Sequence, residues 1–424
     1  MTSETSNGDA PAVAGMLSEK LGTSIAGWET GRGLPPECYR DEAIFELERR
    51  EIFFREWLCV GRADQVPLPG DYMSSTLVGE PLIVLRGEDE SIRVMSAICR
   101  HRGMVLTEPW DGEWGEWFDD PPDSKGNCGR GFRCPYHFWT YGLDGRLLGA
   151  PEMNRTPSFQ RDEISLPRLR TEVWEGFIFV NFDDDAAPLA GRMDSLSALT
   201  RDWQLSKMVT EEPAVLRKLP WNWKIMQENS MDVYHVDRLH FPRHAVLPGA
   251  GYLPLTIDTG DAAIAAGHRA THKDFALSPI GKPLLPVIES LTDDERSLSY
   301  VICVPPTLLI ILNSDSAFYR LVHPRNAGMT DIRQTLMVPS QYRSLPNYKD
   351  LVQVGSAMHL RLNHQDYMVD GSLQRATHSR FAPRGPYGWQ EEIVAQFDSW
   401  VARRYQRATT SLPDVDPAVV GTGV

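Results

Sequence analysis

Two short segments of the chain combine a thiol with an imidazole, Cys99-Arg-His101 and Cys134-Pro-Tyr-His137. Together they offer two sulfurs and two nitrogens. This donor set suits a tetrahedral zinc ion, or a [2Fe–2S] cluster with two Cys on one iron and two His on the other. Zinc fingers usually pair Cys with Cys and His with His, whereas each segment here is mixed and lies between predicted strands. The spacing therefore favours a cluster with chemically distinct ends.

A second group of candidate ligands lies between residues 228 and 240, where His235 and His240 stand five positions apart. Two His and one carboxylate form the facial triad that binds non-haem Fe(II) and leaves other coordination positions open. Five residues along an ideal α-helix, the second imidazole points well away from the first. Binding of one metal by both therefore requires a π-bulge or a helix end between them, and Pro242 permits an end. Taken alone, the two histidines could also be structural.

The surroundings of both motifs carry a family resemblance. Residues 99–103 and 134–146, together with the stretch 228–240, resemble the catalytic alpha subunit of Rieske non-haem iron (ring-hydroxylating) oxygenases. The resemblance implies that the cluster ligands are Cys99, His101, Cys134 and His137, and that His235 and His240 bind a mononuclear iron.

The resemblance also assigns roles to other polar residues. An Asp followed four residues on by an acid and eight on by Gln implies Asp366 as the third iron ligand, with Asp370 the alternative. Asp232 is implied to link His137 of one subunit to His235 of its neighbour, a role that suits a carboxylate because it fixes the tautomer of a ligating imidazole. Asn229 and Tyr234 match positions that line the iron site, and Ser230 replaces an aromatic residue found in several members.

The sequence departs from the family pattern in two places. Phe138 stands where the family usually has Gly, and residues 102–133 form a connection about twice the usual length. This insertion contains Trp110, Trp114, Trp117 and Phe118, and is predicted to be either a surface loop or an element that contacts a neighbouring subunit or an electron donor. Cys128 also lies in it and is expected to be a bystander thiol.

Other basic side chains have no assigned place in these motifs. His244 falls outside the iron motif and is expected in a pocket or at the surface. Four others could bind a substrate carboxylate or form ordinary hydrogen bonds: His268, Arg269, His272 and Arg320.

The elements that must position these residues follow from periodicity. Residues 41–57 predict an amphipathic helix with Ile44, Phe45, Leu47, Ile52 and Phe53 on its buried side. Hairpins are predicted over 81–98 and 138–148, one strand over 174–182, buried strands at 300–304 and 307–312, and helices over 224–239, 348–374 and 389–405. The predicted division is a tail and lead-in segment at 1–40, disordered up to about 27; a Rieske domain at 41–168 with an insertion at about 107–127; a catalytic domain at 169–408; and a disordered tail at 409–424.

Composition limits the other function classes. The chain has 424 residues, 42% hydrophobic and 24% charged, with a formal net charge of −14. This charge argues against a nucleic-acid or anionic-membrane surface, and no apolar run approaches the length of a membrane helix. With no secretion signal recognised, the expected location is cytoplasmic, where six Cys favour metal binding over disulfides.

Taken together, the resemblance implies an α+β fold in which a β-rich Rieske domain precedes a helix-grip antiparallel sheet around the iron. It implies a terminal oxygenase that uses O₂ and NAD(P)H electrons, supplied by a flavin reductase directly or through a ferredoxin. The implied reaction is cis-dihydroxylation, monohydroxylation or oxidative dealkylation of a small organic substrate, expected to be aromatic. A homotrimer is implied, with or without a small beta subunit. The alternatives are a freestanding Rieske electron-transfer protein and a zinc-stabilised binding module.

Overall fold

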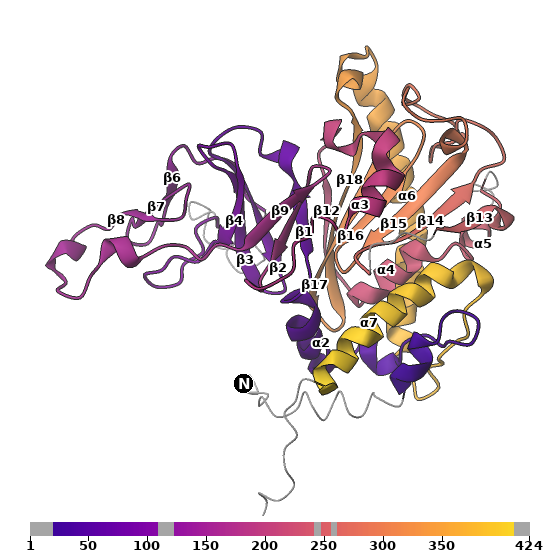
Figure 1. Cartoon of the computed structure of the whole chain (residues 1–424), viewed down its shortest axis with the longest axis horizontal. Helices are drawn as coiled ribbons and strands as arrows, with labels where there is room; N and C mark the ends of the chain where they lie inside the picture. The colour runs from indigo at the N-terminus through magenta and orange to yellow at the C-terminus, as the bar shows by residue number, and fades with distance from the viewer. Residues whose placement is uncertain (1–19, 109–122, 241–246, 256–260, 411–424) are drawn as a thin grey trace, which may run out of the picture.

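The computed structural model describes residues 20–108, 123–240, 247–255 and 261–410. A narrow N-terminal part built mainly of strands stands beside a broader part in which one long sheet is covered by helices (Figure 1). The α+β class and the order of the two parts are as predicted.

The first described segments pack on the C-terminal part. The side chain of Asp41 accepts a hydrogen bond from the amide of Ala43 and caps helix α2 (Glu42–Glu48), which continues as a π-helical turn at Arg49–Phe53. The predicted amphipathic helix is thus present, and its five apolar residues are all buried. The prediction of disorder up to residue 27 is wrong for residues 20–25, which are helical, because Leu21 is fully buried in the core.

The N-terminal part contains two small antiparallel sheets. One has the order β4-β3-β2-β5 and the other β6-β7-β8. Their bounds are β2 Asp71–Leu77, β3 Glu80–Arg86, β4 Ile92–Ser96, β5 Lys125–Asn127, β6 Gly131–Arg133, β7 Thr140–Gly142 and β8 Leu147–Gly149. The pairs β3–β4 and β7–β8 confirm the two predicted hairpins.

A third sheet joins distant segments in the order β1-β10-β9, with β1 at Leu58–Arg62, β9 at Arg170–Trp174 and β10 at Phe177–Asn181. The single strand predicted over 174–182 is wrong, because the chain turns back at Glu175 and Gly176, which have φ values of 46° and 83°. Since β1 pairs with β10, backbone pairing crosses position 168, and the proposed boundary there stays a prediction.

The C-terminal part is built on an antiparallel sheet of eight strands. Its main path is β11-β18-β17-β16-β15-β14-β13, and β12 also pairs with β18. The bounds are β11 Met208–Thr210, β12 Ala214–Leu219, β13 Tyr252–Leu255, β14 Ile264–Arg269, β15 Leu298–Val304, β16 Leu308–Leu312, β17 Ala317–Asn326 and β18 Met329–Pro339. The predicted strands at 300–304 and 307–312 are confirmed as β15 and β16, which are almost wholly buried.

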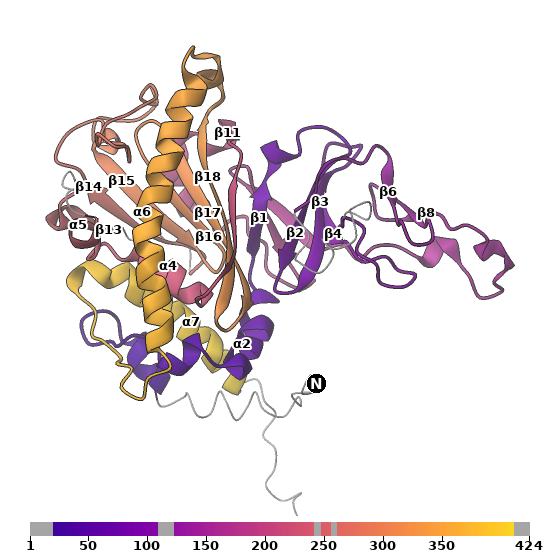
Figure 2. The same cartoon turned by 180° about the vertical axis from the view of Figure 1, so that it is seen from behind.

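Helices close this sheet. The long helix α6 (Tyr348–Ala376) crosses the face of the sheet seen in Figure 2, and α4 (Trp223–Met231) packs against α6. Helix α7 (Glu392–Thr410) packs with α2 in the lower part of the same view (Figure 2). Helix α3 (Asp194–Thr200) precedes β11. The predicted helices 348–374 and 389–405 are confirmed, the second with a 3₁₀ turn at Trp389–Glu391 before α7.

The predicted continuous helix over 224–239 is wrong. Helix α4 begins after Asn222, whose side chain accepts from the amide of Lys224, and ends at Asp232, whose ψ of 103° is extended. A separate single-turn helix, α5, spans Val236–Leu239. The break therefore precedes both histidines instead of falling between them.

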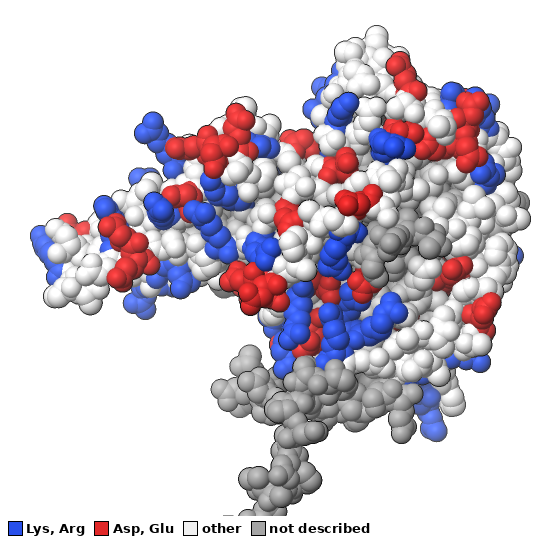
Figure 3. Space-filling model, viewed as in Figure 1, with Lys and Arg blue, Asp and Glu red and all other residues white. Residues whose placement is uncertain are grey.

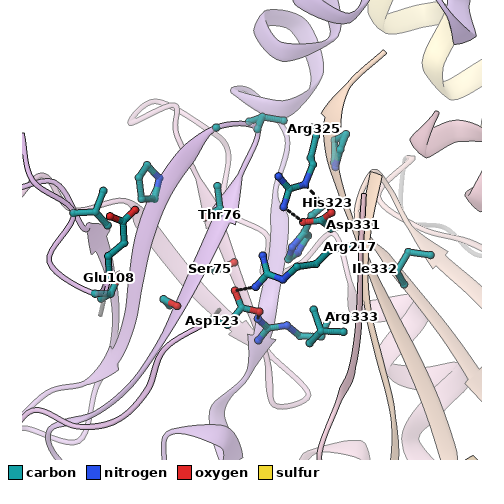
Figure 4. A pocket seen from close by; sticks show the side chains of 18 residues that line it. Ser75, Thr76, Glu108, Asp123, Arg217, His323, Arg325, Asp331, Ile332 and Arg333 are labelled. Atoms are coloured by element: carbon teal, nitrogen blue, oxygen red, sulfur yellow. Dashed lines mark hydrogen bonds and ion pairs between the residues drawn. The ribbon is translucent and has the colours of Figure 1, made fainter. Parts of the chain in front are cut away.

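The insertion lies outside the described residues at 109–122, including its four aromatic side chains. Its described end is anchored: β5 pairs with β2, and Asp123 forms ion pairs with Arg217, at 3.0 Å, and with Arg333. These charges line a polar cavity of about 330 Å³ between the two parts of the chain (Figure 4). In the same cavity Arg325 of β17 pairs with Asp331 of β18 at 2.6 Å, within the C-terminal sheet, so the ion pairs that link the two parts of the chain here are those of Asp123.

On the face drawn in Figure 3, acidic and basic side chains are interspersed over both parts of the molecule. Among the described residues, no helix has the length and apolar character required to span a membrane.

Candidate metal centres

The four proposed cluster ligands lie on two neighbouring loops, one after β4 and one between β6 and β7. Cys99 and Cys134 are buried, with 3% and 2% of their surface exposed, whereas His101 and His137 are exposed. The two imidazole rings are 4.6 Å apart. The thiols therefore face the domain interior and the imidazoles face solvent.

Neighbouring side chains support this arrangement. The hydroxyl of Tyr141 lies 3.3 Å from Sγ of Cys99 and accepts a hydrogen bond from the amide of Arg100. Trp139 stacks on His101 at 4.7 Å. Burial, together with the adjacent Cys99, raises the pKa of the Cys134 thiol. Two inward sulfurs and two outward imidazoles fit a [2Fe–2S] cluster, in which Cys99 and Cys134 would hold one iron and His101 and His137 the other.

Phe138, which replaces the usual Gly, has a left-handed backbone with φ of 60°. A non-glycine residue in this region costs about 1 kcal/mol or more, which is a physical reason for Gly at this position. Its ring is 52% exposed, and the guanidinium of Arg133 lies 5.0 Å from its centre. The ring therefore lies outward beside the cluster loop and does not bury the histidines.

The three proposed iron ligands meet in the C-terminal part. His235, His240 and Asp366 each offer a ligand atom within 4.8 Å of the other two. Oδ1 of Asp366 is 3.1 Å from Nε2 of His240 and 3.6 Å from Nε2 of His235. The histidines occupy the two ends of α5, and Asp366 projects from α6. Because α5 is only one turn long, the rings converge to 5.1 Å despite the five-residue spacing.

A partner on each histidine leaves its Nε2 atom for the metal. Nδ1 of His235 is 3.2 Å from Oδ2 of Asp232, and Nδ1 of His240 is 3.0 Å from Oε1 of Gln365. Sequence reasoning anticipated Asp232 but missed Gln365, whose only signal was its position beside Asp366. Such outer partners fix the tautomer and the orientation of a ligating imidazole.

The electrostatics of the group suit a cation. Burial alone would lower the pKa of His235, but the carboxylates of Asp232 and Asp366 outweigh it and raise the pKa to about 10. Burial likewise opposes ionisation of Asp366, yet the two histidines bring its pKa down to about 2. Oδ1 of Asp366 is buried and makes no well-oriented hydrogen bond among the described residues. Two imidazoles and a carboxylate with an unused oxygen fit Fe(II).

Asp370, the alternative ligand, lies one helical turn beyond Asp366 and outside the donor group. It is fully buried, and neither of its oxygens has a hydrogen-bond partner in the described part of the chain. Burial, with the negative charge of Asp366, raises its pKa to about 8. The geometry favours Asp366 as the ligand and leaves Asp370 a protonated neighbour at neutral pH.

A cavity of about 110 Å³ opens beside the three ligands. Asn229 lines it, as predicted from the family pattern. Tyr234 does not: its side chain is 46% exposed and lies against the guanidinium of Arg238, 4.8 Å from the ring centre. The rest of the described wall is mostly apolar, with Val233, Leu247, Leu277, Val301, Leu309, Ile311 and Leu362.

The remaining candidate residues separate by location. Arg320 and His268 line the cavity, whereas Arg269 pairs with Asp294 at the surface at 2.8 Å and His272 bonds the carbonyl of Gly281. His244 lies outside the described residues. The half-buried Cys128 donates to the carbonyl of Gly70, and burial raises its pKa to about 11, which suits a bystander thiol.

Two family models match the chain. The Rieske [2Fe-2S] domain covers residues 56–160, and the ring hydroxylating alpha subunit (catalytic domain) covers residues 200–407. The chain therefore belongs to the Rieske non-haem iron oxygenases, the family that the sequence motifs predicted, whose cofactors are a [2Fe–2S] cluster and a mononuclear iron.

Curated relatives include both monooxygenases and dioxygenases. The oxygenase subunit of carnitine monooxygenase from Acinetobacter baumannii is 30% identical over 214 residues, which are 49% of this chain and 52% of that protein. The alpha subunit of biphenyl 2,3-dioxygenase from Rhodococcus jostii is 32% identical over 53% of this chain and 47% of its own length. The aligned segment thus spans about half the length of the curated relatives.

Solved structures share the fold over almost the whole chain. A quaternary ammonium Rieske monooxygenase, studied for carnitine oxidation by gut microbiota and for inter-subunit electron transfer, has a TM-score of 0.74 at 22% identity. The match covers 91% of this chain and 98% of that one. Naphthalene 1,2-dioxygenase from Rhodococcus sp. has a TM-score of 0.72 at 20% identity, covering 96% of this chain and 100% of the other.

Proposed function

We propose that this chain is the terminal oxygenase of a multicomponent system that inserts oxygen from O₂ into a small organic substrate. The observation that carries the proposal is the presence, in one chain, of the two Cys-His loops and of the His235, His240 and Asp366 group beside a cavity. A freestanding electron-transfer protein does not require the group of His235, His240 and Asp366. A zinc-stabilised binding module requires neither that group nor the cavity beside it.

When bound, the two metal groups would supply electron transfer and O₂ activation. The chain's own residues orient the ligands and exclude water. Asp232 and Gln365 hold the two imidazoles with Nε2 toward the metal. The apolar wall limits access of water to the reacting atoms. In a monooxygenation the substrate C–H becomes C–OH, and the second oxygen atom leaves as water after uptake of two electrons and two protons.

For the substrate, we propose a small molecule with a quaternary ammonium group in place of the aromatic compound expected from the family resemblance. Support comes from relatives named carnitine monooxygenase and glycine betaine monooxygenase, the latter 30% identical over 54% of this chain. Hydroxylation of a carbon next to the nitrogen gives a carbinol whose C–N bond breaks as its hydroxyl loses a proton, which yields a tertiary amine, a carbonyl compound and H⁺. The biphenyl and naphthalene dioxygenases keep an aromatic hydrocarbon as the second candidate.

The electron path is proposed to run between subunits. Within one folded chain, the loop between β6 and β7 and the iron-site helix α5 lie on opposite sides of the molecule (Figure 1). In a trimer, a neighbouring copy would bring the His137 of its cluster loop toward Asp232 of this copy. Asp232 is partly exposed and already contacts His235. A flavin reductase, with or without a ferredoxin, is the proposed donor, and the proposed assembly is a homotrimer with or without a small beta subunit.

The activity test couples the iron-loaded protein to a surrogate reductase and NADH. O₂ uptake and product formation are measured with carnitine, glycine betaine, biphenyl and naphthalene, and the His235→Ala variant is the control. Turnover of a quaternary ammonium compound, absent from the variant, is expected. Stoichiometric zinc without iron or acid-labile sulfide would end the oxygenase proposal.

A co-assembly test addresses the electron path. A variant without a cluster (Cys99→Ala) is mixed with one without an iron site (His235→Ala), each inactive alone. Mixed trimers should recover activity because an intact cluster then faces an intact iron site across an interface. Verified mixed trimers without activity would exclude the inter-subunit path and leave Asp232 a local structural role.

A further inference from the structure

A buried cation lies in the wall of the iron-site cavity. Arg320, on strand β17, has only 3% of its surface exposed, yet it lines the cavity together with His235 and Asp366. An arginine stays charged at any physiological pH. Its burial in a mostly apolar cavity is costly unless another charge or a set of hydrogen bonds compensates it.

Three neutral side chains hold this guanidinium in place. Nη1 donates to Oγ of Ser230 at 2.6 Å, Nη2 to Oδ1 of Asn363 at 2.8 Å, and Nε to Oε1 of Gln334 at 3.1 Å. These acceptors come from α4, α6 and β18, so Arg320 is fixed from three directions. The ring of Phe318 supports it further, with the guanidinium carbon 5.7 Å from the ring centre.

The acceptors fix the position of Arg320 but do not neutralise its charge. A guanidinium has five N–H groups, and three are used by these bonds, which leaves two without an acceptor among the described residues. None of the carboxylates in the described part of the chain forms an ion pair with it. Its effect reaches His359, where burial first and then Arg320 lower the pKa to about 3, so that imidazole adds no second positive charge.

We propose that Arg320 binds a carboxylate of the substrate, so that the enzyme acts on small organic acids, zwitterionic quaternary ammonium acids included, in preference to neutral or purely cationic analogues. The inference rests on the proposed oxygenase function and narrows its substrate class. Two free N–H groups on one planar fork suit the two oxygens of a carboxylate. Of the sequence's four basic candidates for this role, the structure retains Arg320 on these contacts.

The position of the anion site also limits substrate length. Asn363, which holds Arg320, precedes the ligand Asp366 by three residues on α6, a step of about 5 Å along the helix axis. Ser230, which also holds Arg320, lines the same cavity as His235. When the substrate carboxylate binds Arg320, the substrate carbons a few bonds from that carboxylate therefore lie beside the metal ligands. This arrangement suits a short acid better than an extended hydrocarbon.

Binding of matched ligand pairs tests the proposal. Titration calorimetry on the iron-loaded protein compares glycine betaine with choline, and benzoate with benzamide. Within each pair the carboxylate is replaced by a neutral group. The carboxylate member is expected to bind about 10-fold more tightly or better, the range of a charge-assisted hydrogen-bonded pair. Equal affinities within both pairs, or binding of neither carboxylate, would overturn the proposal.

Variants locate the effect. Arg320→Gln should remove the preference for the carboxylate member, and Arg320→Lys, which keeps the charge but loses the fork, should retain part of it. Arg269→Gln is the matched control and should keep the full preference, because Arg269 lies at the surface with Asp294. Persistence of the preference in Arg320→Gln, with its folding verified, would refute the assignment. Should that variant not fold, the wild-type ligand pairs still decide.

The outcomes separate this inference from the proposed function. Iron and acid-labile sulfide content, with O₂-dependent turnover of any substrate, judge the oxygenase activity. The preference for the carboxylate member within each ligand pair tests whether Arg320 binds the substrate carboxylate. An active oxygenase that binds choline and glycine betaine equally would retain the proposed function and reject the carboxylate site.

Discussion

Replacing Asp370 with Asn should make the metal-free protein more stable, by an amount that increases with pH. The carboxyl group is fully buried, its oxygens have no hydrogen-bond partner among the described residues, and its pKa is raised from 3.8 to about 8. Between these two values the folded state binds a proton that the unfolded state has released. Stability therefore falls as pH rises from 3.8 to 8.

The size of the effect follows from the two pKa values. Keeping the carboxyl group protonated in the folded state costs up to about 2 kcal/mol at pH 5 and about 4 kcal/mol at pH 7. The Asp370→Asn variant has no such titration, so its advantage in unfolding free energy should grow by about 3 kcal/mol between these pH values. Thermal unfolding of the metal-stripped wild type and variant across pH 5 to 8 measures it. A difference that does not change with pH would refute the reasoning.

The same variant distinguishes the two candidate ligands. Asp370→Asn should retain one mononuclear iron per chain, whereas Asp366→Asn should lose it, because of these two carboxylates it is Asp366 that lies within 4.8 Å of the ligand atoms of both histidines. Iron analysis after desalting, with the cluster absorbance as an internal standard, provides the comparison. Iron loss in the Asp370 variant alone would reverse the assignment.

Five further substitutions test other parts of the site. Gln365→Leu should weaken iron retention against a chelator about 10- to 100-fold, since it removes the partner of a ligating imidazole; unchanged retention would mean that the contact is incidental. Cys128→Ser should keep the rhombic EPR signal of the reduced cluster and Cys134→Ser should abolish it, and the reverse result would show a misassigned ligand. Asp232→Ala should keep the cluster and, supplied with excess iron to offset the lost partner of His235, should hold both metals and still lose most turnover, while peroxide drives some oxidation; full NADH-driven turnover of the iron-loaded variant would contradict its proposed role. Phe138→Gly should change the unfolding free energy by less than about 1 kcal/mol, because relief of backbone strain offsets the lost contact with a guanidinium; a larger change in the thermal melt would exclude this balance.

The sequence was most informative where chemistry is local. The cluster loops, the hairpins and the long C-terminal helices follow from ligand spacing and periodicity, and the family models and strand pairings agree with them. The strand predicted over 174–182 failed because Trp174 and the apolar run from Phe177 were taken as one strand, whereas the chain turns at Glu175 and Gly176 between them. The register of β9 with β10 places Trp174 and Phe177 opposite each other across a two-residue turn.

The iron site was predicted in composition but not in geometry. From the spacing of the two histidines we expected a helix irregularity between them. The structure instead ends the helix at Asp232, before both histidines. The contacts of Arg320 with Ser230, Asn363 and Gln334 could not be read from the sequence, because these residues are separated by up to 133 positions and meet only when α4, α6 and the sheet pack. Long-range side-chain pairing has no signature in a single sequence.

The single turn of α5 has a consequence for the order in which the site assembles. Its backbone is held by few hydrogen bonds, from the amides of Arg238 and Leu239 to the carbonyl of His235, and so short a helix is marginal on its own. A metal ion bound at both ends of α5 and to α6 would tie this turn to the core and raise the free energy of its local opening. Amide hydrogen exchange at α5 should therefore slow on iron loading, well before any substrate is added, while the interior of α6 changes little.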